Sequence, residues 1–225
     1  MKIITSKIIE YDRIYSMVRK DIINFISTIP NNVTVVAATK YVDSKDIFTL
    51  YNSGIKEYGE NRVDSFLEKY DELKELNDIN WHFIGHLQRN KAKQVVNKID
   101  YLHSLDSIEL AKILSKYRIK PLNVFIEISI NLEENKNGVP YYEAKDFINK
   151  IKGLTNINIV GLMMMAYKNS AHPDEEFKKL RLLRDELEKE CNIKLPYLSM
   201  GMSDDYQYAI KEGATHIRLG RILFI

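Results

Sequence analysis

One lysine in this chain stands where an amine could do covalent chemistry. The segment from Val33 to Thr39 is apolar and rich in β-branched residues, which predicts a strand, and Lys40 follows it directly. Taking an ammonium group out of water is costly, and a desolvated amine is a nucleophile that forms Schiff bases with carbonyl compounds. The alternative is an amine that extends past the strand end into solvent. The segment alone leaves both interpretations open.

A second polar group follows the next short apolar run. Gly59-Glu60-Asn61-Arg62 lies between that run and a helical pattern. In a parallel barrel, the ends of neighbouring strands share one face, so Glu60 and Asn61 would lie on the same face as Lys40. Asn61 is also a favoured N-cap residue, and capping of the following helix is an alternative or additional role.

The last part of the chain has glycines and a serine in a pattern suited to an anion. The segment from Leu198 to Asp205 joins a predicted strand to a helix, and Gly220-Arg221 follows the last predicted strand. Glycine lets the backbone approach a ligand closely, and amide groups at helix N-termini attract anions. Ser203 can cap the helix, donate to a phosphate, or do both. A phosphorylated aldehyde would satisfy both this cradle and the amine of Lys40.

The segment from Trp81 to Lys93 is dense in polar groups. His82 and His86 are four residues apart, but the apolar residues between them predict a strand, where such a pair shares no helical face, so we expect no metal site. The basic residues from Arg89 onward lack interleaved aromatic residues. We therefore interpret them as a solvated face, with RNA binding as the alternative.

Composition excludes several classes of protein. The 33 lysines and arginines nearly balance the 31 aspartates and glutamates in 225 residues, which gives no reason to expect a nucleic-acid or membrane partner. Cys191 is the one cysteine, so no disulfide framework can form. Charged residues interrupt the apolar ones at the N-terminus, which argues against a signal peptide. We expect a cytoplasmic protein.

Eight short apolar runs alternate with amphipathic segments along the chain. These predicted strands are Val33 to Ala38, Ile55 to Tyr58, Trp81 to Ile84, Tyr101 to His103, Asn123 to Ile128, Ile157 to Gly161, Tyr197 to Met200 and His216 to Leu219. No cluster of glycine or proline marks a linker, so we expect one domain. Eight strand–helix units predict a (β/α)8 barrel, and an open doubly wound sheet, which usually has fewer strands, is the alternative.

Helical spacing is clearest in two segments. One runs from Val63 to Leu73 and the other from Phe177 to Leu187, each with apolar residues that return to one face every three or four positions. Pro173, followed by three acidic residues, predicts the start of the second helix. We also expect an opening helix from about Ser6 to Phe25.

Six segments, in this order along the chain, resemble the YggS/PROSC family of pyridoxal phosphate homeostasis proteins. They are Val36-Ala37-Ala38-Thr39-Lys40, Gly59-Glu60-Asn61-Arg62, Trp81-His82-Phe83-Ile84-Gly85-His86-Leu87-Gln88-Arg89-Asn90-Lys91, Gly161-Leu162-Met163, Leu198-Ser199-Met200-Gly201-Met202-Ser203 and Ile217-Arg218-Leu219-Gly220. The similarity spans Val33 to Phe224. The third and fifth segments are long enough to be highly specific.

The resemblance implies an α/β fold, a single-domain (β/α)8 TIM barrel of the alanine racemase N-terminal type over residues 1–225, with the N-terminal helix at about 6–25 and the barrel at about 33–225. It implies pyridoxal 5'-phosphate as the cofactor, bound as a Schiff base to Lys40. Arg218 would face the pyridine nitrogen and Asn61 would lie near the phenolic oxygen. The other residues implied around the cofactor are Ser203, Gly220 and Arg221 at the phosphate, and His86, Met163 and Ser199 in the pocket.

The family is regarded as lacking a turnover reaction of its own. The resemblance therefore implies a protein that carries or buffers the cofactor in vitamin B6 homeostasis, with apo forms of pyridoxal phosphate enzymes as partners. We expect a monomer. A pyridoxal-phosphate racemase is the alternative, but racemisation needs acid–base groups on two faces of the substrate. In racemases the second base comes from a separate β-domain, for which we expect no residues here.

Two positions depart from the family's pattern. Arg221 stands where the family often has a small hydroxyl residue, so a guanidinium contact to the phosphate would replace a hydroxyl contact. Ile225 stands where a glycine commonly follows phenylalanine, and the family's short tail is missing. Closure of the barrel after the last strand therefore does not follow from the sequence.

Overall fold

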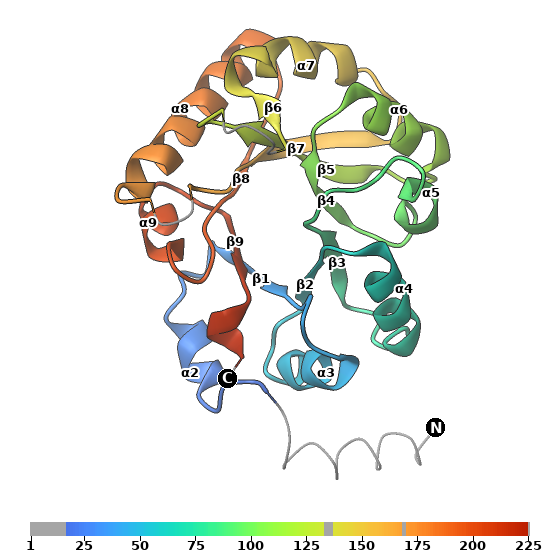
Figure 1. Ribbon diagram of the computed structural model, residues 1–225, viewed down its shortest axis with the longest axis vertical. Helices are drawn as coiled ribbons and strands as arrows, with labels where there is room; N and C mark the ends of the chain where they lie inside the picture. Colours follow the sequence, from blue (N-terminus) through green and yellow to red (C-terminus); the bar gives the residue numbers. More distant parts are fainter. Residues whose placement is uncertain (1–16, 133–136, 168–169, 225) are drawn as a thin grey trace.

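A closed ring of eight parallel strands forms the centre of the computed structural model, which describes residues 17–132, 137–167 and 170–224 (Figure 1). The strands of the ring are β1 (Thr34–Ala38), β2 (Glu57–Glu60), β3 (Asn80–Phe83), β4 (Tyr101–Leu105), β5 (Leu122–Ser129), β7 (Ile157–Met163), β8 (Tyr197–Ser199) and β9 (His216–Leu219). They follow one another around the ring in this order, and pairing of β9 with β1 closes it. The predicted (β/α)8 barrel is confirmed.

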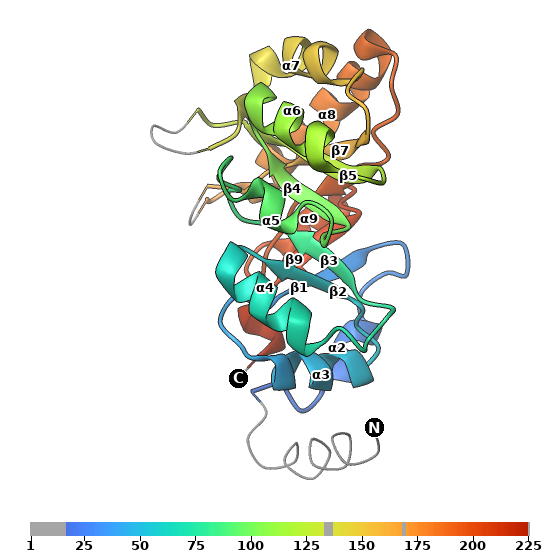
Figure 2. The ribbon, with the colours of Figure 1, turned by 90° about the vertical axis from the view of Figure 1, so that its right-hand side faces the viewer.

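Helices cover the outside of the ring (Figure 1, and from the side in Figure 2). They are α2 (Ile22–Ser27), α3 (Ser44–Asn52), α4 (Val63–Glu72), α5 (Ala92–Val95), α6 (Ile108–Tyr117), α7 (Ala144–Ile151), α8 (Pro173–Cys191) and α9 (Tyr206–Lys211). Their apolar faces pack on the outward faces of the strands and form the main core. No helix among the residues that the structure describes is long and apolar enough to cross a membrane.

Local sequence sets the ends of the helices. The carboxylate of Asp43 accepts from the backbone N of Lys45 at 2.9 Å and of Asp46 at 3.1 Å, which satisfies two free amides at the start of α3. Helix α8 begins at Pro173, as predicted, with acidic residues in its first turn. It ends at Asn192, whose φ of 49° is left-handed.

The predicted opening helix is only partly tested. Residues 6–16 of it lie outside the described residues. Residues 17–21 are not helical, because buried Val18 forms an antiparallel bridge with Phe224 and the N–H of Arg19 donates to the carbonyl of Leu223 at 3.0 Å. The prediction of helix at 17–21 was therefore wrong.

The second strand was predicted two residues too early. It spans Glu57–Glu60 rather than Ile55 to Tyr58, so the chain brings a carboxylate to its buried end. Glu60 is fully buried because Lys69 and Thr39 donate to it, a pairing that local hydrophobicity does not reveal. The other predicted strands agree with the structure to within two residues at each end. A further strand, β6 (Val139–Pro140), pairs with β5 outside the ring and was not predicted.

The barrel closes fully after the last strand. Four residues of β9 pair with four of β1, from Thr34↔His216 to Ala37↔Leu219. At the neighbouring β7–β8 contact the strands are so close that a Cβ on Gly161 would lie 1.9 Å from the carbonyl oxygen of Tyr197. Glycine is therefore required there.

Aromatic and imidazole rings fill the inside of the ring. His82 of β3 lies 5.0 Å from His103 of β4, which lies 4.4 Å from Phe125 of β5. Phe125 lies 5.2 Å from His216 of β9, a strand that is not its neighbour in the ring. Such contacts between distant strands place these rings inside the barrel, which is packed rather than open.

Candidate functional site

The carboxyl ends of the strands form one end of the barrel, the mouth, where the sequence placed its candidate residues. Lys40 lies in the turn that follows β1, and it is exposed. Its ammonium lies 5.1 Å from the centre of the Tyr41 ring. Of the two interpretations left open for Lys40, the structure agrees with the solvated amine, because β1 ends at Ala38, Thr39 is the last buried residue and Lys40 begins the turn beyond it.

A buried ion pair holds the turn that carries Lys40. The ammonium of Lys69, on α4, donates to Glu60 Oε1 and to the carbonyl of Thr39, each at 2.7 Å. The hydroxyl of Thr39 donates to the same carboxylate oxygen at 2.6 Å. These three groups join the ends of β1 and β2 to the helix behind them, so the backbone beside Lys40 is fixed. Sequence reasoning missed Lys69, a charged residue three positions after Phe66 among the buried residues of α4.

Asn61 lies directly after β2 and is half-buried. It is not the cap of the following helix, because Arg62 occupies the N-cap position of α4, without a side-chain capping bond. The backbone of Asn61 is close to the loop after β3, since a Cβ on Gly85 would lie 2.5 Å from the carbonyl oxygen of Asn61. The capping alternative is excluded, and a role at the mouth stays a prediction.

Arg218 brings a buried positive charge to the mouth. It is 5% exposed, and its Nη1 donates to the carbonyl of Ser199 at 2.9 Å and to the hydroxyl of Ser199 at 2.6 Å. Its Nη2 donates to the carbonyl of Met164 at 2.9 Å. Burial lowers the pKa of Arg218 to about 10, against the opposing influence of the Glu127 and Asp205 carboxylates. The guanidinium stays charged at neutral pH.

Glu127 is a second ionisable group at the mouth, and sequence reasoning missed it. It lies near the end of β5 and is 5% exposed. Burial raises the pKa of Glu127 to about 7, helped by the charge of Asp106 and opposed by that of Arg218. The sequence signal was an acidic residue inside an otherwise apolar strand.

The loops after β8 and β9, where an anion cradle was predicted, are in contact. The hydroxyl of Ser203 accepts from the backbone N of Gly220 at 3.3 Å and of Ile222 at 3.4 Å, which brings the two loops together. A Cβ on Gly220 would lie 3.6 Å from the carbonyl oxygen of Ala38, so the cradle lies against the end of β1. Asp205 occupies the N-cap position of α9, so Ser203 is not the cap.

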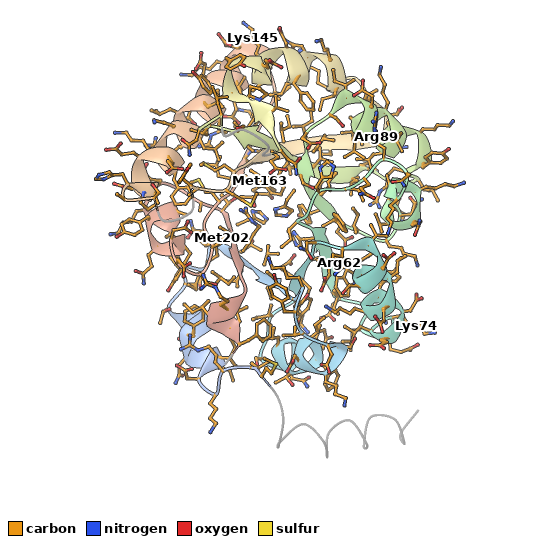
Figure 3. All side chains as sticks on the ribbon, in the orientation of Figure 1. Arg62, Lys74, Arg89, Lys145, Met163 and Met202 are labelled. Carbon is orange, nitrogen blue, oxygen red and sulfur yellow. The ribbon has the colours of Figure 1, made fainter. Side chains whose placement is uncertain are left out.

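Arg221 directly follows Gly220 and begins the short turn after β9. Its guanidinium pairs with the carboxylate of Asp204, and both side chains are largely exposed. A cavity of about 760 Å³ opens beside this pair, between the loops that follow β7 and β8. Met165, Met202 and Tyr208 are among the residues that line it. Figure 3 shows Met202 on this side of the mouth and Arg62 on the opposite side, near α4.

The remaining predicted residues divide into two groups. Met163 and Ser199 are buried neighbours in paired strands, and Met163 packs with Phe125 inside the barrel. His86 lies in the loop after β3 with 47% of its side chain exposed, and its Nδ1 pairs with Asp106 at 3.3 Å. Among the described residues, no group of three or more histidine, cysteine or acidic side chains is arranged to hold a metal ion.

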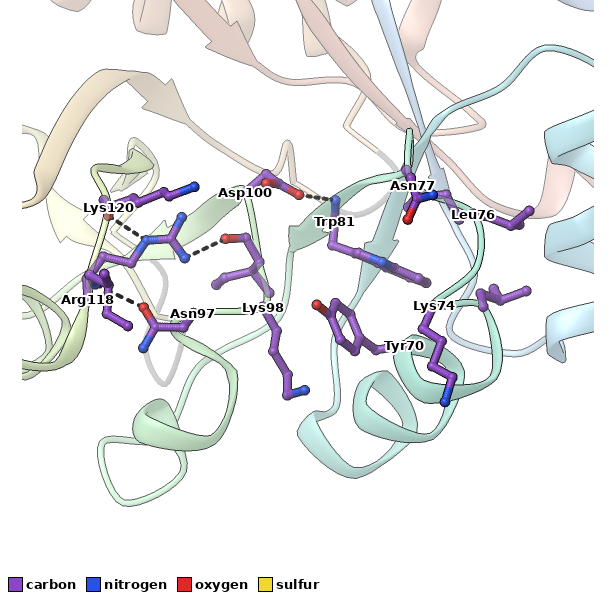
Figure 4. A pocket seen from close by; sticks show the side chains of 14 residues that line it. Tyr70, Lys74, Leu76, Asn77, Trp81, Asn97, Lys98, Asp100, Arg118 and Lys120 are labelled. Atoms are coloured by element: carbon purple, nitrogen blue, oxygen red, sulfur yellow. Dashed lines mark hydrogen bonds between the residues drawn. The ribbon is translucent and has the colours of Figure 1, made fainter.

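A pocket of about 430 Å³ lies away from the mouth, between α4 and the segment around α5 (Figure 4). Several of its polar groups already have partners within the protein. Asp100 accepts from the backbone N of Trp81 at 2.8 Å, and the guanidinium of Arg118 donates to backbone carbonyls, including that of Ile99 at 2.9 Å. Lys98 lies 4.3 Å above the ring of Tyr70. The mouth is therefore the better candidate site.

Comparison with known proteins assigns the chain to a family. Residues 42–225 match the family model described as the alanine racemase N-terminal domain. A pyridoxal phosphate homeostasis protein of Aquifex aeolicus is 44% identical over 199 residues, covering 86% of this chain and 87% of that protein. The chain belongs to the pyridoxal phosphate homeostasis protein family. A homeostasis protein of Synechocystis is 39% identical, covering 88% of this chain and 94% of that protein.

Solved structures agree with the family assignment. PipY of Synechococcus elongatus, determined with pyridoxal phosphate bound, has a TM-score of 0.83 and 32% identity, covering 90% of this chain and 97% of that one. Alanine racemase of Corynebacterium glutamicum has a TM-score of 0.70 and 13% identity and covers 90% of this chain but 57% of that one. The racemase likeness concerns the fold alone, and the homeostasis protein family is the nearer comparison.

Proposed function

We propose that this chain binds pyridoxal 5'-phosphate at the barrel mouth and that it carries or buffers the cofactor without turning over amino acids. The observation that carries the proposal is the position of the cradle. Gly220 lies against Ala38, two residues before Lys40, which supports a site where this turn would bind the anion beside the amine. The names of the relatives and the cofactor bound in PipY support the same proposal.

The donor set fits a phosphorylated aldehyde. Lys40 supplies an exposed amine, and the hydroxyl of Ser203 with the amides of Gly220 and Ile222 suits a phosphate. The guanidinium of Arg218 suits the ring nitrogen. When bound, the cofactor supplies a reactive aldehyde and an electron-withdrawing ring.

We assign further pocket roles to four residues. Asn61 would face the phenolic oxygen, and Met163, Ser199 and His86 would border the ring. The side chain of Arg221 is paired with Asp204, so we assign it no phosphate contact through its guanidinium and retain only its backbone in the cradle.

Chemical trapping tests the attachment. Borohydride reduction of protein loaded with pyridoxal phosphate, followed by peptide mass mapping, should place the label on Lys40. Lys40→Ala should lose the visible absorbance band, whereas Lys45→Ala, a nearby exposed lysine on α3, should keep it. A label on a different lysine would refute the assignment.

The lack of turnover can be tested against the racemase alternative. We propose that this barrel supplies no opposing base for a substrate carbanion, and fast carbanion chemistry also requires exclusion of water. Solvent deuterium should enter the α-position of alanine no faster than with free pyridoxal phosphate. Saturable exchange at about 1 per second or more, lost in Lys40→Ala, would favour a racemase.

Delivery of the cofactor to enzymes is the remaining part of the proposal. We propose that the chain acts as a cytoplasmic monomer and passes pyridoxal phosphate to apo enzymes. Loaded protein mixed with an apo aminotransferase should restore its activity, and sedimentation should give the mass of one chain. If the enzyme gains no activity over a buffer control, the delivery role is wrong.

A further inference from the structure

An unbroken line of hydrogen-bonded side chains crosses the inside of the barrel. Arg218 Nη1 donates to Ser199 Oγ at 2.6 Å, and that oxygen lies 2.8 Å from His103 Nδ1. His103 Nε2 lies 2.8 Å from His82 Nδ1, and His82 Nε2 lies 2.6 Å from Glu57 Oε2. We call these five side chains the relay. Its members come from β9, β8, β4, β3 and β2.

The relay runs from one end of the barrel to the other. Arg218 lies at the mouth, whereas Glu57 is the first residue of β2 and so lies at the opposite end. The side chain of Glu57 is 24% exposed. Ser199 and the two histidines are fully buried. The line therefore connects a carboxylate near solvent to a buried guanidinium about which the proposed cofactor site is built.

The chemistry of the two ends fixes the direction of the first and the last bond of the relay, and hydrogen-bond satisfaction of Ser199 favours one direction for the bonds between them. A guanidinium has no acceptor and an ionised carboxylate has no donor. Ser199 accepts from Arg218, so its own proton is available to His103 Nδ1. His103 then carries its proton on Nε2 and donates to His82, which donates through Nε2 to Glu57. In this arrangement both rings are neutral, and all four bonds point the same way.

The opposite arrangement leaves a buried group without an acceptor. If His82 carried a second proton, it would donate to His103 Nε2, and His103 Nδ1 would donate to Ser199. The Ser199 hydroxyl would then receive two donors at one oxygen, and its proton would have lost its acceptor in the relay. An unsatisfied buried hydroxyl is costly. Burial also lowers the pKa of His103 well below its ordinary value, and the positive charge of Arg218 acts in the same direction.

Neighbouring aromatic rings restrict the orientation of the two imidazoles in the relay. His82 is stacked on Tyr101 with 4.6 Å between centroids and 4° between planes, and His103 packs on Phe125 at 4.4 Å. Neither imidazole can turn over without displacing an aromatic neighbour. At the mouth, the bonds from Arg218 to the carbonyls of Ser199 and Met164 fix the plane of the guanidinium. No ion pair of Arg218 is found in the described part of the chain.

We propose that Glu57, His82, His103 and Ser199 are positioning residues that orient Arg218 and polarise it from the far end of the barrel. The proposal rests on the proposed function, because Arg218 matters through the cofactor ring that it faces. Its consequence is a long-range dependence: the charge of Glu57 should alter the environment of a cofactor bound at the mouth, although Glu57 lies at the other end.

The protonation pattern is tested without any cofactor. Nitrogen-15 NMR of the imidazoles at pH 7 should show His82 and His103 both neutral, each with its proton on Nε2. A doubly protonated His82, or His103 with its proton on Nδ1, would overturn the direction of the relay. This result does not depend on whether pyridoxal phosphate binds, so failure of the proposed function would be recognised separately.

The functional consequence is tested by removing charge while keeping the hydrogen bond. Glu57→Gln retains an oxygen that can accept from His82, and Glu57→Asp retains the charge. His216→Gln is the control, since His216 is a buried ring of the same layer whose Nδ1 pairs with Thr215 instead. The readouts are the absorbance maximum of bound pyridoxal phosphate and its dissociation constant.

Glu57→Gln should move the absorbance maximum and weaken retention by about tenfold, the range expected for losing one charge-assisted interaction. Glu57→Asp should restore the maximum, and His216→Gln should leave it in place. An unchanged spectrum in Glu57→Gln, or an equal change in His216→Gln, would refute the positioning role. Protein that binds no pyridoxal phosphate at all would refute the proposed function instead.

Discussion

Two buried polar networks in this barrel join a cation to a carboxylate in different ways. Behind β2, Lys69 contacts Glu60 directly at 2.7 Å. Inside the ring, Arg218 reaches Glu57 only through a hydroxyl and two imidazoles. The first network is compact and lies between a strand and a helix, whereas the second extends from one end of the barrel to the other.

We expect the two networks to play different roles, the first in holding the fold and the second in ligand binding. Opposite charges in contact largely cancel, so the Lys69–Glu60 pair presents little charge to the mouth and serves mainly to hold the Thr39 turn. In the relay the charges are far apart, so the positive charge of Arg218 remains available to a ligand. The compact network also leaves Glu60 Oε2 buried without a partner. Loss of the cation should therefore reduce the stability of the protein more in the compact network than in the relay.

The largest effect is expected from breaking the compact pair. Lys69→Met leaves a buried carboxylate without its cation, which typically costs about 3 to 5 kcal/mol. We expect that loss in the free energy of unfolding, measured by urea titration. Lys91→Met is the control, because Lys91 pairs with Asp64 at 2.9 Å on the surface, where such a pair contributes about 0 to 1 kcal/mol.

A double variant sharpens this prediction. Glu60→Leu with Lys69→Met removes both charges, and such replacements are often close to neutral. The double variant should therefore be more stable than Lys69→Met alone. Equal stability of Lys69→Met and Lys91→Met would mean that the buried pair does not support the fold.

Acid should weaken the inside of the barrel. Burial lowers the pKa of His103 well below its usual value and that of His216 to about 3, whereas both rings take up protons near pH 6.5 when unfolded. The unfolded state thus binds more protons below pH 6.5, so stability falls as pH falls. Glu127 acts in the opposite sense, because its folded pKa of about 7 lies above its unfolded value.

Taken together, these groups should cost about 1.5 kcal/mol in unfolding free energy between pH 6.5 and 5. Glu127→Gln removes the opposing contribution. The variant should therefore lose roughly twice as much unfolding free energy over the same pH interval. Urea titrations of the unmodified protein and of the variant at the two pH values measure both changes in unfolding free energy. A stability that rises on acidification would show that the rings are not held neutral.

At the mouth, a substitution should change the affinity for pyridoxal phosphate without an equal change in the free energy of unfolding. Ser203→Ala removes the hydroxyl between the two loops, and we expect pyridoxal phosphate retention to weaken by about 0.5 to 3 kcal/mol. Equilibrium dialysis measures the change, with pyridoxal as the comparison ligand. If pyridoxal bound as tightly as pyridoxal phosphate to the unmodified protein, the cradle would not be a phosphate site.

The smallest change in stability is expected at Lys40. Its side chain is exposed and outside both networks, so Lys40→Ala should alter the free energy of unfolding by less than about 0.5 kcal/mol. Thermal and urea unfolding check this. A loss as large as that of Lys69→Met would place Lys40 in the supporting structure and blur the distinction between the two regions.

The positions of the strands and of the mouth loops could be predicted from local sequence. The run before Lys40 and the segment from Leu198 to Asp205 carry their own patterns of apolar residues and turn residues, and these patterns depend on near neighbours. The strand ends were less certain because Glu60 is buried by a helix that comes later in the chain.

The polar networks could not be predicted, because they depend on closure of the barrel. His103 and Ser199 are 96 positions apart, and only the ring order brings them within 2.8 Å. His82 was weighed as half of a metal pair with His86, whereas in the structure its partners are Glu57 and His103. The exposure of Lys40 was likewise set by where the strand ends, one residue before Thr39.

The hydroxyl of Ser203 has a consequence for exchange. It already accepts from the amides of Gly220 and Ile222, so those donors do not depend on an anion to be satisfied. A phosphate bound here would accept the proton of the Ser203 hydroxyl and share the two amides with it, and the gain would be limited because those amides already have an acceptor. On release, the hydroxyl would again accept from both amides, so no buried donor would be stranded. The proposed unloading would therefore need no partner to pull the loops apart.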